Sequence, residues 1–302
     1  MKTPRLILAA AILSLAMGTY GRSQDDAHHQ HWMVSLKSVG GCNPRSGDAG
    51  PEYYFRQRDA DGRWQARELP DFLSSQVQDV PTIFFVHGNP TPLYRVHEMG
   101  RQMWQLLERE AEGRPFRLVV WAWPDDRKMN RRTAQYEASR SDVQGYGLAR
   151  LVEQGNLDAP TSYIGYSFGA RVVASALELL AGGQVAGRQL DDAPATRLRG
   201  ARVMLLGAAL DDYWLAPGYR YGRALDMAER MVVTTNACDP AMRFYGLIYR
   251  GPGPNAVGRF GPACLNRIGE ARDKLEVIDL SCSVGKNHDW YLYMSAAGFL
   301  SR

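Results

Sequence analysis

The stretch Gly165-Tyr166-Ser167-Phe168-Gly169 decides the fold class of this 302-residue chain. It fits the pattern Gly-x-Ser-x-Gly, in which a serine occupies a sharp turn between a strand and a helix and projects its hydroxyl from the end of a sheet. The two glycines have no Cβ, so strand and helix can approach closely enough for the serine to hold that conformation. Ser167 is therefore the candidate nucleophile.

The residues on either side of this turn predict the strand and the helix that the pattern requires. Thr161 to Ile164 is a short β-prone run, and Gly182-Gly183 marks the expected end of the helix. Apolar residues recur between them at helical spacing, namely Phe168, Val172, Val173, Ala176, Leu177 and Leu180. In a chain with 30 glycines, the alternative is a serine in an ordinary turn, so the order of further residues has to decide.

A serine hydroxyl needs a histidine base, and the histidine needs a carboxylate that fixes its tautomer. With this type of turn they follow in the order Ser, acid, His. Only His288 lies beyond Ser167, in a loop-like stretch after the strand pattern Lys274 to Leu280; the other histidines are His28, His29, His31, His87 and His97. His288 is thus the candidate base, with a surface histidine as the alternative.

The candidate acid is Asp239. It follows the expected strand Met231 to Thr235, in a turn-rich stretch at the edge of the sheet where Ser167 is expected. The alternative acids are Asp211 and Asp212, which follow the preceding expected strand, Ala201 to Leu206.

An oxyanion hole needs one N–H from the residue after the nucleophile and another from the loop after an early strand. Phe168 is the first expected donor. The second comes from His87-Gly88-Asn89-Pro90-Thr91, which follows an apolar run. Because Pro90 has no N–H, Asn89 is the expected donor and Gly88 the next choice. His87 is expected to orient this loop, while an ordinary turn at a strand end is the alternative.

Taken together, these motifs resemble the α/β-hydrolase superfamily, and within it bacterial serine hydrolases of the esterase/lipase-like kind. The resemblance runs from about Trp32 to the C-terminus and rests on Phe85-Val86-His87-Gly88-Asn89, Trp121-Ala122-Trp123-Pro124, Gly165 to Ala170, Cys238-Asp239-Pro240 and His288-Asp289-Trp290. It implies an α/β fold with a mostly parallel central sheet, antiparallel lead-in strands, flanking helices and a minimal cap. It says little about the substrate.

The loop His87 to Thr91 also resembles that of haloalkane dehalogenases and epoxide hydrolases, which use an aspartate nucleophile. Here Ser167 stands at that position. A serine adduct would be an ether that water does not readily hydrolyse, so acyl transfer is expected and dehalogenation is not.

Alternating strand and helix patterns favour one α/β domain, residues 22–302. Between Asp211 and Ala228 lie four aromatic residues that either cover the site or pack onto the body of the protein. The expected strands are Trp32 to Val39, Tyr53 to Arg58, Trp64 to Arg67, Thr82 to Val86, Phe116 to Trp121, Ser162 to Tyr166, Ala201 to Leu206, Met231 to Thr235 and Leu275 to Leu280. The expected helices are Tyr94 to Arg109, Ala138 to Glu153, Phe168 to Leu180 and His288 to Leu300.

Residues 1–21 have the basic start, the apolar stretch and the small residues of a signal peptide, with an uncleaved anchor as the alternative. Loss of Lys2 and Arg5 lowers the net charge from +4 to +2, which does not favour a nucleic-acid partner.

Export implies oxidising conditions, in which disulfides form, and Cys42, Cys238, Cys264 and Cys282 allow three full pairings. Cys238 to Cys282 is the bridge expected, because both cysteines end neighbouring strands.

The sequence thus predicts an exported serine hydrolase that cleaves a small-molecule ester or related acyl bond through an acyl-enzyme, without a cofactor or a membrane span in the mature form. Two alternatives stay open: a catalytically silent binding protein of the same fold, and an acyltransferase or peptidase with the same three residues. The acyl and alcohol groups and the oligomeric state do not follow from the sequence.

Overall fold

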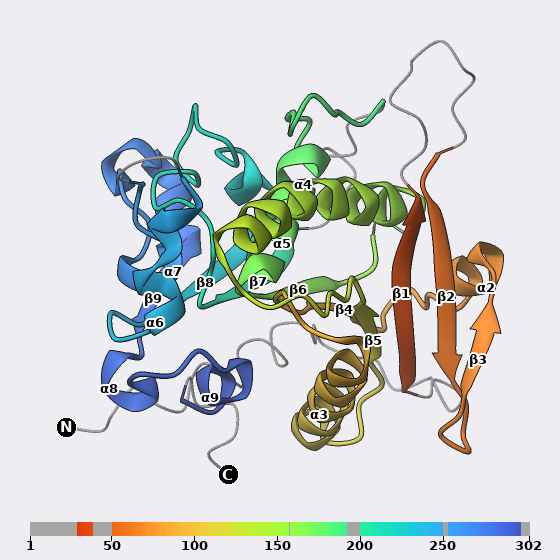
Figure 1. The fold of residues 1–302 in the computed structure, drawn as a ribbon. Helices are drawn as coiled ribbons and strands as arrows, with labels where there is room; N and C mark the ends of the chain where they lie inside the picture. The colour runs from red at the N-terminus through yellow and green to blue at the C-terminus, as the bar shows by residue number, and fades with distance from the viewer. Residues whose placement is uncertain (1–28, 39–49, 157, 192–199, 250–252, 297–302) are drawn as a thin grey trace.

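The computed structural model describes residues 29–38, 50–156, 158–191, 200–249 and 253–296. Within them the chain forms an α/β fold around a nine-stranded sheet in the order β3-β2-β1-β5-β4-β6-β7-β8-β9 (Figure 1). The strands are β1 (Gln30–Ser38), β2 (Glu52–Arg58), β3 (Trp64–Arg67), β4 (Thr82–Val86), β5 (Arg117–Trp121), β6 (Thr161–Tyr166), β7 (Ala201–Leu206), β8 (Ala228–Thr235) and β9 (Leu275–Asp279). All nine lie within three residues of the ranges expected from sequence.

The strand directions agree with a mostly parallel sheet, and they refine the expectation for the first three strands. From β5 to β9 every neighbouring pair is parallel. β2 pairs antiparallel with β1 and with β3, as expected for lead-in strands. β1, however, pairs parallel with β5, so of these three strands β2 alone opposes the core strands. Alternation in the sequence cannot reveal this, because period 2 is the same in both directions.

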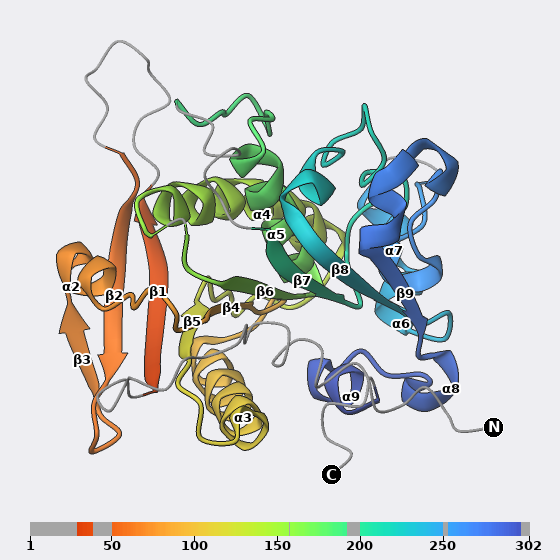
Figure 2. The same cartoon turned by 180° about the vertical axis from the view of Figure 1, so that it is seen from behind.

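Helices cover both faces of the sheet, as the two sides of the molecule show (Figures 1 and 2). α4 (Arg131–Glu153) and α5 (Phe168–Leu180) lie on one face, and α3 (Leu93–Ala111) and the short α9 (Trp290–Met294) on the other. Each face of the sheet has its own hydrophobic core. Phe84 belongs to the core under α4 and α5 and Phe85 to the core under α3 and α9, so successive residues of a central strand are both buried. This explains why these strands appear in the sequence as continuous apolar runs.

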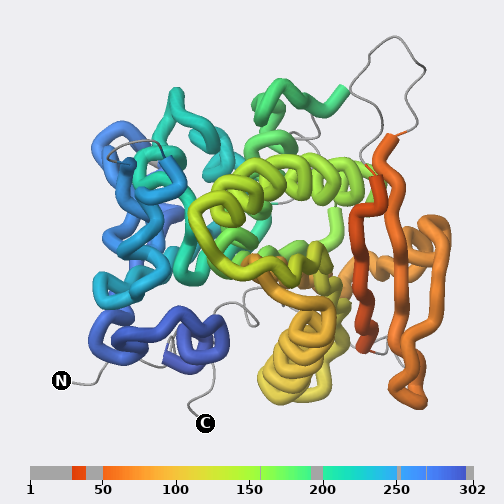
Figure 3. Tube along the Cα trace, in the orientation of Figure 1, coloured from red at the N-terminus to blue at the C-terminus, as the bar shows by residue number. Residues whose placement is uncertain are grey.

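Short elements connect the remaining strands. They include α2 (Leu69–Ser74), η3 (Ala224–Met227), α6 (Pro240–Arg243), η4 (Tyr245–Ile248), α7 (Val257–Phe260), η5 (Leu265–Arg267), η6 (Gly269–Lys274) and α8 (Ser281–Val284), where η denotes a 3-10 helix. Figure 3 shows the chain after β8 gathered at the end of the molecule opposite to β2 and β3. The short elements after β8, among them α6 and η4, form the cover of the sheet edge.

The helix α3 lies within two residues of its expected range, whereas α4 and α9 differ more. α4 begins at Arg131, seven residues before the expected Ala138, because the side chain of Asn130 accepts a hydrogen bond from the Thr133 N–H at 3.0 Å and caps the helix. The last helix begins at Trp290, two residues after His288, and residues 297–300 of its expected range lie outside the described part. In the portion of the chain that the structure describes, no helix is long and apolar enough to cross a bilayer.

Candidate active site

Ser167 lies between the end of β6 and the start of α5, with φ 55° and ψ −122°. This left-handed φ is uncommon for a residue with a side chain and stores strain. Strand and helix approach closely on both sides of Ser167. A Cβ on Gly169 would lie 2.1 Å from the Val86 carbonyl oxygen, and one on Gly165 would lie 2.6 Å from Ala170 Cα. The glycines of the motif are therefore required by close backbone approach, as the sequence indicated.

The structure brings three of the expected residues together at the carboxyl ends of β6, β8 and β9. His288 Nε2 lies 3.0 Å from Ser167 Oγ, and His288 Nδ1 lies 2.6 Å from Asp239 Oδ2. When Nδ1 carries the proton and donates it to the carboxylate, Nε2 is free to accept from the serine hydroxyl. This is the tautomer that a general base needs.

Asp239 is fully buried, yet its carboxylate is well satisfied. Oδ1 accepts from the N–H groups of Ala241 and Met242, and Oδ2 accepts from the Tyr293 hydroxyl at 2.5 Å. Burial by itself would raise the pKa of Asp239, but the hydrogen bonds and the interaction with His288 outweigh it and hold this pKa below its ordinary value. The group beside His288 is therefore an anion at neutral pH.

Asp211, the alternative acid, has a different set of partners. It is buried and accepts hydrogen bonds from the hydroxyls of Tyr213, Tyr245 and Tyr249. Tyr245 belongs to η4, so this carboxylate anchors a part of the cover. Of the two aspartates, Asp239 is the one hydrogen-bonded to His288.

His288 is itself held by its surroundings. The Tyr166 hydroxyl donates to the His288 carbonyl at 2.9 Å, and the two rings pack with centroids 5.0 Å apart. The Asn236 side chain donates to the Gly285 carbonyl at 2.8 Å and so ties the loop before His288 to the end of β8. These contacts hold the backbone of the histidine loop and pack the Tyr166 ring against the imidazole.

A cavity of about 620 Å³ opens beside Ser167 and His288. Its walls are mostly apolar and come from the start of α4, from the chain before it, and from α6 and η4. The apolar residues include Met129, Ala134, Pro240, Met242, Leu247 and Ile248. Phe244, also in the wall, and Leu247 are each 59% exposed, so the outer part of the cavity is apolar as well.

The aromatic residues between Asp211 and Ala228 do not line this cavity. Trp214 and Tyr221 are buried in the core on the α4 and α5 face, and their rings meet edge to face with centroids 5.2 Å apart. Of the two alternatives considered for them, packing onto the body is correct. The cover comes from the turn-rich stretch after β8 instead.

Both expected oxyanion donors border the cavity. Phe168 is the first residue of α5, so its N–H has no acceptor within the helix. Asn89 lies in the loop after β4, next to Gly88, where a Cβ would come within 2.8 Å of Ser167 Cβ. The loop thus passes against the serine turn at the point where a reacting carbonyl would lie.

Both ring nitrogens of His87 form hydrogen bonds with nearby backbone groups. Nδ1 lies 2.7 Å from the Gly88 carbonyl, to which it donates, and Nε2 accepts from the Trp123 N–H at 3.1 Å. Complete burial lowers the pKa of His87 to about 4, so it is neutral. These contacts agree with the expectation that His87 orients the loop.

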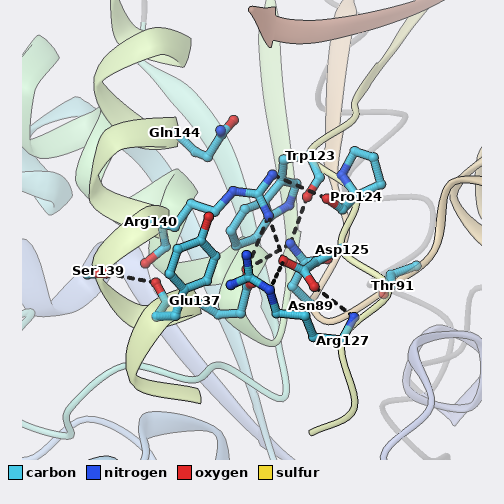
Figure 4. A network of polar contacts seen from close by, with 12 residues as sticks. Asn89, Thr91, Trp123, Pro124, Asp125, Arg127, Glu137, Ser139, Arg140 and Gln144 are labelled. Carbon is cyan, nitrogen blue, oxygen red and sulfur yellow. Dashed lines mark hydrogen bonds and ion pairs between the residues drawn. The ribbon is translucent and has the colours of Figure 1, made fainter. Parts of the chain in front are cut away.

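Sequence reasoning missed a buried polar network behind Asn89, drawn in Figure 4. Asn89 turns its side-chain amide away from Ser167 and donates to the Trp123 carbonyl at 2.7 Å and to Glu137 Oε2 at 2.9 Å. Arg140 lies 3.5 Å from Glu137 and 3.6 Å from Asp125. Burial, followed by a hydrogen bond with Asp125, raises the pKa of Glu137 to about 7 against the opposing charge of Arg140.

The expected Cys238 to Cys282 bridge is not formed. Cys238, Cys264 and Cys282 are free thiols in the structure, and Cys42 lies outside the described residues. Neighbouring strands do bring the two loops together, but a hydrogen bond from the Ala237 N–H to Ser281 Oγ joins them, and both thiols are exposed. Adjacency of two strand ends does not fix the Cβ directions that a bridge requires. No group of His, Cys, Asp or Glu side chains arranged to hold a metal ion occurs among the described residues.

No protein-family model and no curated protein matches this chain. Among solved structures, it is similar to a thermophilic esterase, Est2, from the Planctomycetes species Thermogutta terrifontis. The native form is 13% identical over 66% of this chain and 70% of that one, with a TM-score of 0.33. The butyrate-bound form is 12% identical over 73% and 81%, and the form phosphoramylated by tabun 12% over 73% and 80%, each with a TM-score of 0.36. Values this low support no inference about activity.

Proposed function

We propose that the protein is a serine hydrolase that cleaves an ester or a related acyl bond. Ser167 attacks the carbonyl carbon while His288 takes the hydroxyl proton, and Asp239 stabilises the imidazolium. The N–H groups of Phe168 and Asn89 hold the oxyanion. His288 then returns the proton to the leaving alcohol, and water activated by the same histidine releases the acyl group and restores Ser167.

One observation carries this proposal: the continuous hydrogen-bond chain from Ser167 through His288 to Asp239, with distances of 3.0 and 2.6 Å. Both lie within the reach that proton transfer requires. Ser167, at one end of this chain, has φ 55°, an uncommon and strained conformation for a residue with a side chain. A serine without a chemical role would gain nothing from that strain.

The cavity favours a substrate with an apolar acyl or alcohol group. Among the described residues of its walls, Arg131 is the one side chain with a permanent formal charge. Arg131 donates to the Tyr249 carbonyl at 2.8 Å and so closes the wall against η4. An uncharged ester is therefore the expected small-molecule substrate, and its apolar part gains free energy by leaving water.

We also propose that the protein is exported. The support is the sequence of residues 1–21, with Lys2 and Arg5 before an apolar stretch and Gly18 and Gly21 after it. Mass spectrometry of the N-terminus of protein recovered outside the cytoplasm tests this, with cleavage expected near Gly21. Protein that retains Met1 and stays in the cytoplasm would contradict it.

Hydrolysis of p-nitrophenyl esters by purified protein tests the catalytic proposal. Ser167→Ala and His288→Ala are each expected to lower kcat by several orders of magnitude, because the members of such a triad act as a unit. Lys286→Ala, two residues before the histidine on the same loop, is the matched control and should retain activity. Turnover by the wild type that survives Ser167→Ala would overturn the proposal, as would a wild type without esterase activity.

A further inference from the structure

Asn89 lies beside Ser167 in the loop after β4, but its side chain serves the interior. The residue is 6% exposed, and both amide hydrogens are used, one on the Trp123 carbonyl and one on Glu137. An amide held at two points cannot rotate without losing a buried hydrogen bond. The orientation of the Asn89 backbone is therefore coupled to these two acceptors.

Of these two acceptors only Glu137 is a side chain, since the other is the backbone carbonyl of Trp123. The Glu137 side chain is fully buried on α4, behind the loop and away from the cavity lining. Burying a carboxyl group costs free energy unless it is well partnered, and Oε1 of Glu137 has no hydrogen-bond partner among the described residues. A purely structural acceptor for one amide hydrogen does not need such a group.

The surroundings of Glu137 explain how the carboxyl group is retained. Arg140, one turn along α4, approaches it at 3.5 Å and also reaches the Pro124 carbonyl at 3.3 Å. The Asp125 N–H donates to the Thr91 carbonyl at 2.9 Å, which ties the chain after β5 to the end of the same loop. The loop that contains Asn89 is thus fastened to α4 and to the chain after β5.

We propose that Glu137 is a positioning residue for the reaction: it holds the Asn89 amide and thereby aims the Asn89 backbone N–H at the developing oxyanion. This rests on the proposed function. The Glu137 side chain accepts one of the two hydrogen bonds that hold this amide, at 2.9 Å, and so helps to fix the loop. Misplacement of an oxyanion donor affects the transition state and leaves the ground-state complex nearly unchanged.

Kinetics of Glu137→Ala and Glu137→Gln on a p-nitrophenyl ester test this, with rates expressed per active site titrated by a fluorophosphonate. We expect Glu137→Ala to lower kcat about 10- to 100-fold and to leave KM within about threefold. The fall in kcat is smaller than for complete loss of an oxyanion donor, because the Asn89 N–H is misplaced and not removed. Glu137→Gln keeps an acceptor for the Asn89 amide and should recover most of that loss. Titration per active site removes any contribution from misfolded protein.

The matched controls are Glu178→Ala and Glu178→Gln. Glu178 is also a buried glutamate with a pKa raised to about 7, mainly by burial, but it lies near the end of α5 and accepts from the Arg223 N–H. Both controls should keep the kcat of the wild type. They report what the loss of a buried carboxyl group does by itself.

A trifluoromethyl ketone, which forms a tetrahedral adduct with an oxyanion on the serine, provides the second readout. Its inhibition constant should rise in Glu137→Ala in proportion to the fall in kcat, whereas a merely structural defect would raise KM or lower the number of titrated sites. A kcat and an inhibition constant equal to those of Glu178→Ala would overturn the inference and leave the proposed function intact. Wild-type protein without Ser167-dependent turnover would overturn both.

Discussion

Tyr293 donates its hydroxyl to the same oxygen of Asp239, Oδ2, that accepts from His288, at a distance of 2.5 Å. Tyr293 is fully buried and comes from α9, the helix that begins directly after the histidine loop. One oxygen of Asp239 thus contacts both His288 and Tyr293, which lie 49 and 54 positions further along the chain.

Tyr293→Phe is therefore expected to lower kcat about tenfold, because the carboxylate loses one of the donors that fix it. The same donor helps to lower the pKa of Asp239, so its removal should move the acidic limb of the pH–rate profile to higher pH. The profile of kcat/KM between pH 4 and 9 checks both effects. An unchanged profile with an unchanged kcat would show that Tyr293 only packs.

Asparagine substitutions separate the two buried aspartates. Asp239→Asn should lower kcat on the order of 10³- to 10⁴-fold, since the amide no longer fixes the tautomer of His288. Asp211→Asn should leave kcat within a few fold and raise KM, because it weakens the anchor of η4 at the cavity wall. Steady-state kinetics on one ester distinguish them, and the reverse pattern would assign Asp211 as the acid.

His31 makes stability depend on pH. Its two ring nitrogens are buried and have no hydrogen-bond partner among the described residues, its ring stacks on Trp104, and burial, followed by the nearby charge of Arg58, lowers its pKa from 6.5 to about 3. Between pH 6.5 and about 3 the unfolded chain binds a proton at this position that the folded protein does not. This residue therefore contributes full stability above pH 6.5 and loses it progressively as the pH falls.

Urea unfolding of the wild type and His31→Phe at pH 7.5 and 5.0 tests this. The variant should gain about 2 kcal/mol relative to the wild type on going to pH 5.0, since it has no proton to bind there. The comparison of the two proteins cancels other titrating groups, such as Glu137 and Glu178. A difference that is the same at both pH values would show that His31 is protonated equally in both states.

Ala134 offers a test of the cavity. It lies in the wall on α4, and Ala134→Phe would fill part of the space beside Ser167. We expect the ratio of kcat/KM for an octanoate ester to that for an acetate ester to fall at least tenfold, because each buried CH₂ contributes about 0.8 kcal/mol. Ser139→Phe, on the exposed side of the same helix, is the control. Equal ratios in all three proteins would place the acyl chain elsewhere.

The serine turn and the positions of the strands along the chain could be predicted from the sequence because both depend on local chemistry. Glycines around Ser167 and the continuous apolar runs of the central strands are visible without any knowledge of the fold. Asp239 and His288 were then expected from the order Ser, acid, His along the chain, and from strand ends that share one edge of a parallel sheet.

What the sequence did not predict depends on side-chain direction and on contacts between distant segments. Asn89 was expected for its backbone, but that its amide faces Glu137 follows only when α4 packs behind the loop. The same holds for the thiols of Cys238 and Cys282, which lie on neighbouring loops without bonding. The early start of α4 was the exception, because Asn130 three residues before Thr133 is a helix cap that the sequence could have revealed.

The most direct test of the central claim is the reaction of the purified protein with a fluorophosphonate, followed by intact mass and peptide mapping. A nucleophile activated by His288 should give one adduct per chain, located on Ser167, and Ser167→Ala should give none. His288→Ala should slow the labelling strongly while leaving the fold intact. A wild-type protein that stays unlabelled, or that carries the adduct at another residue, would contradict the account.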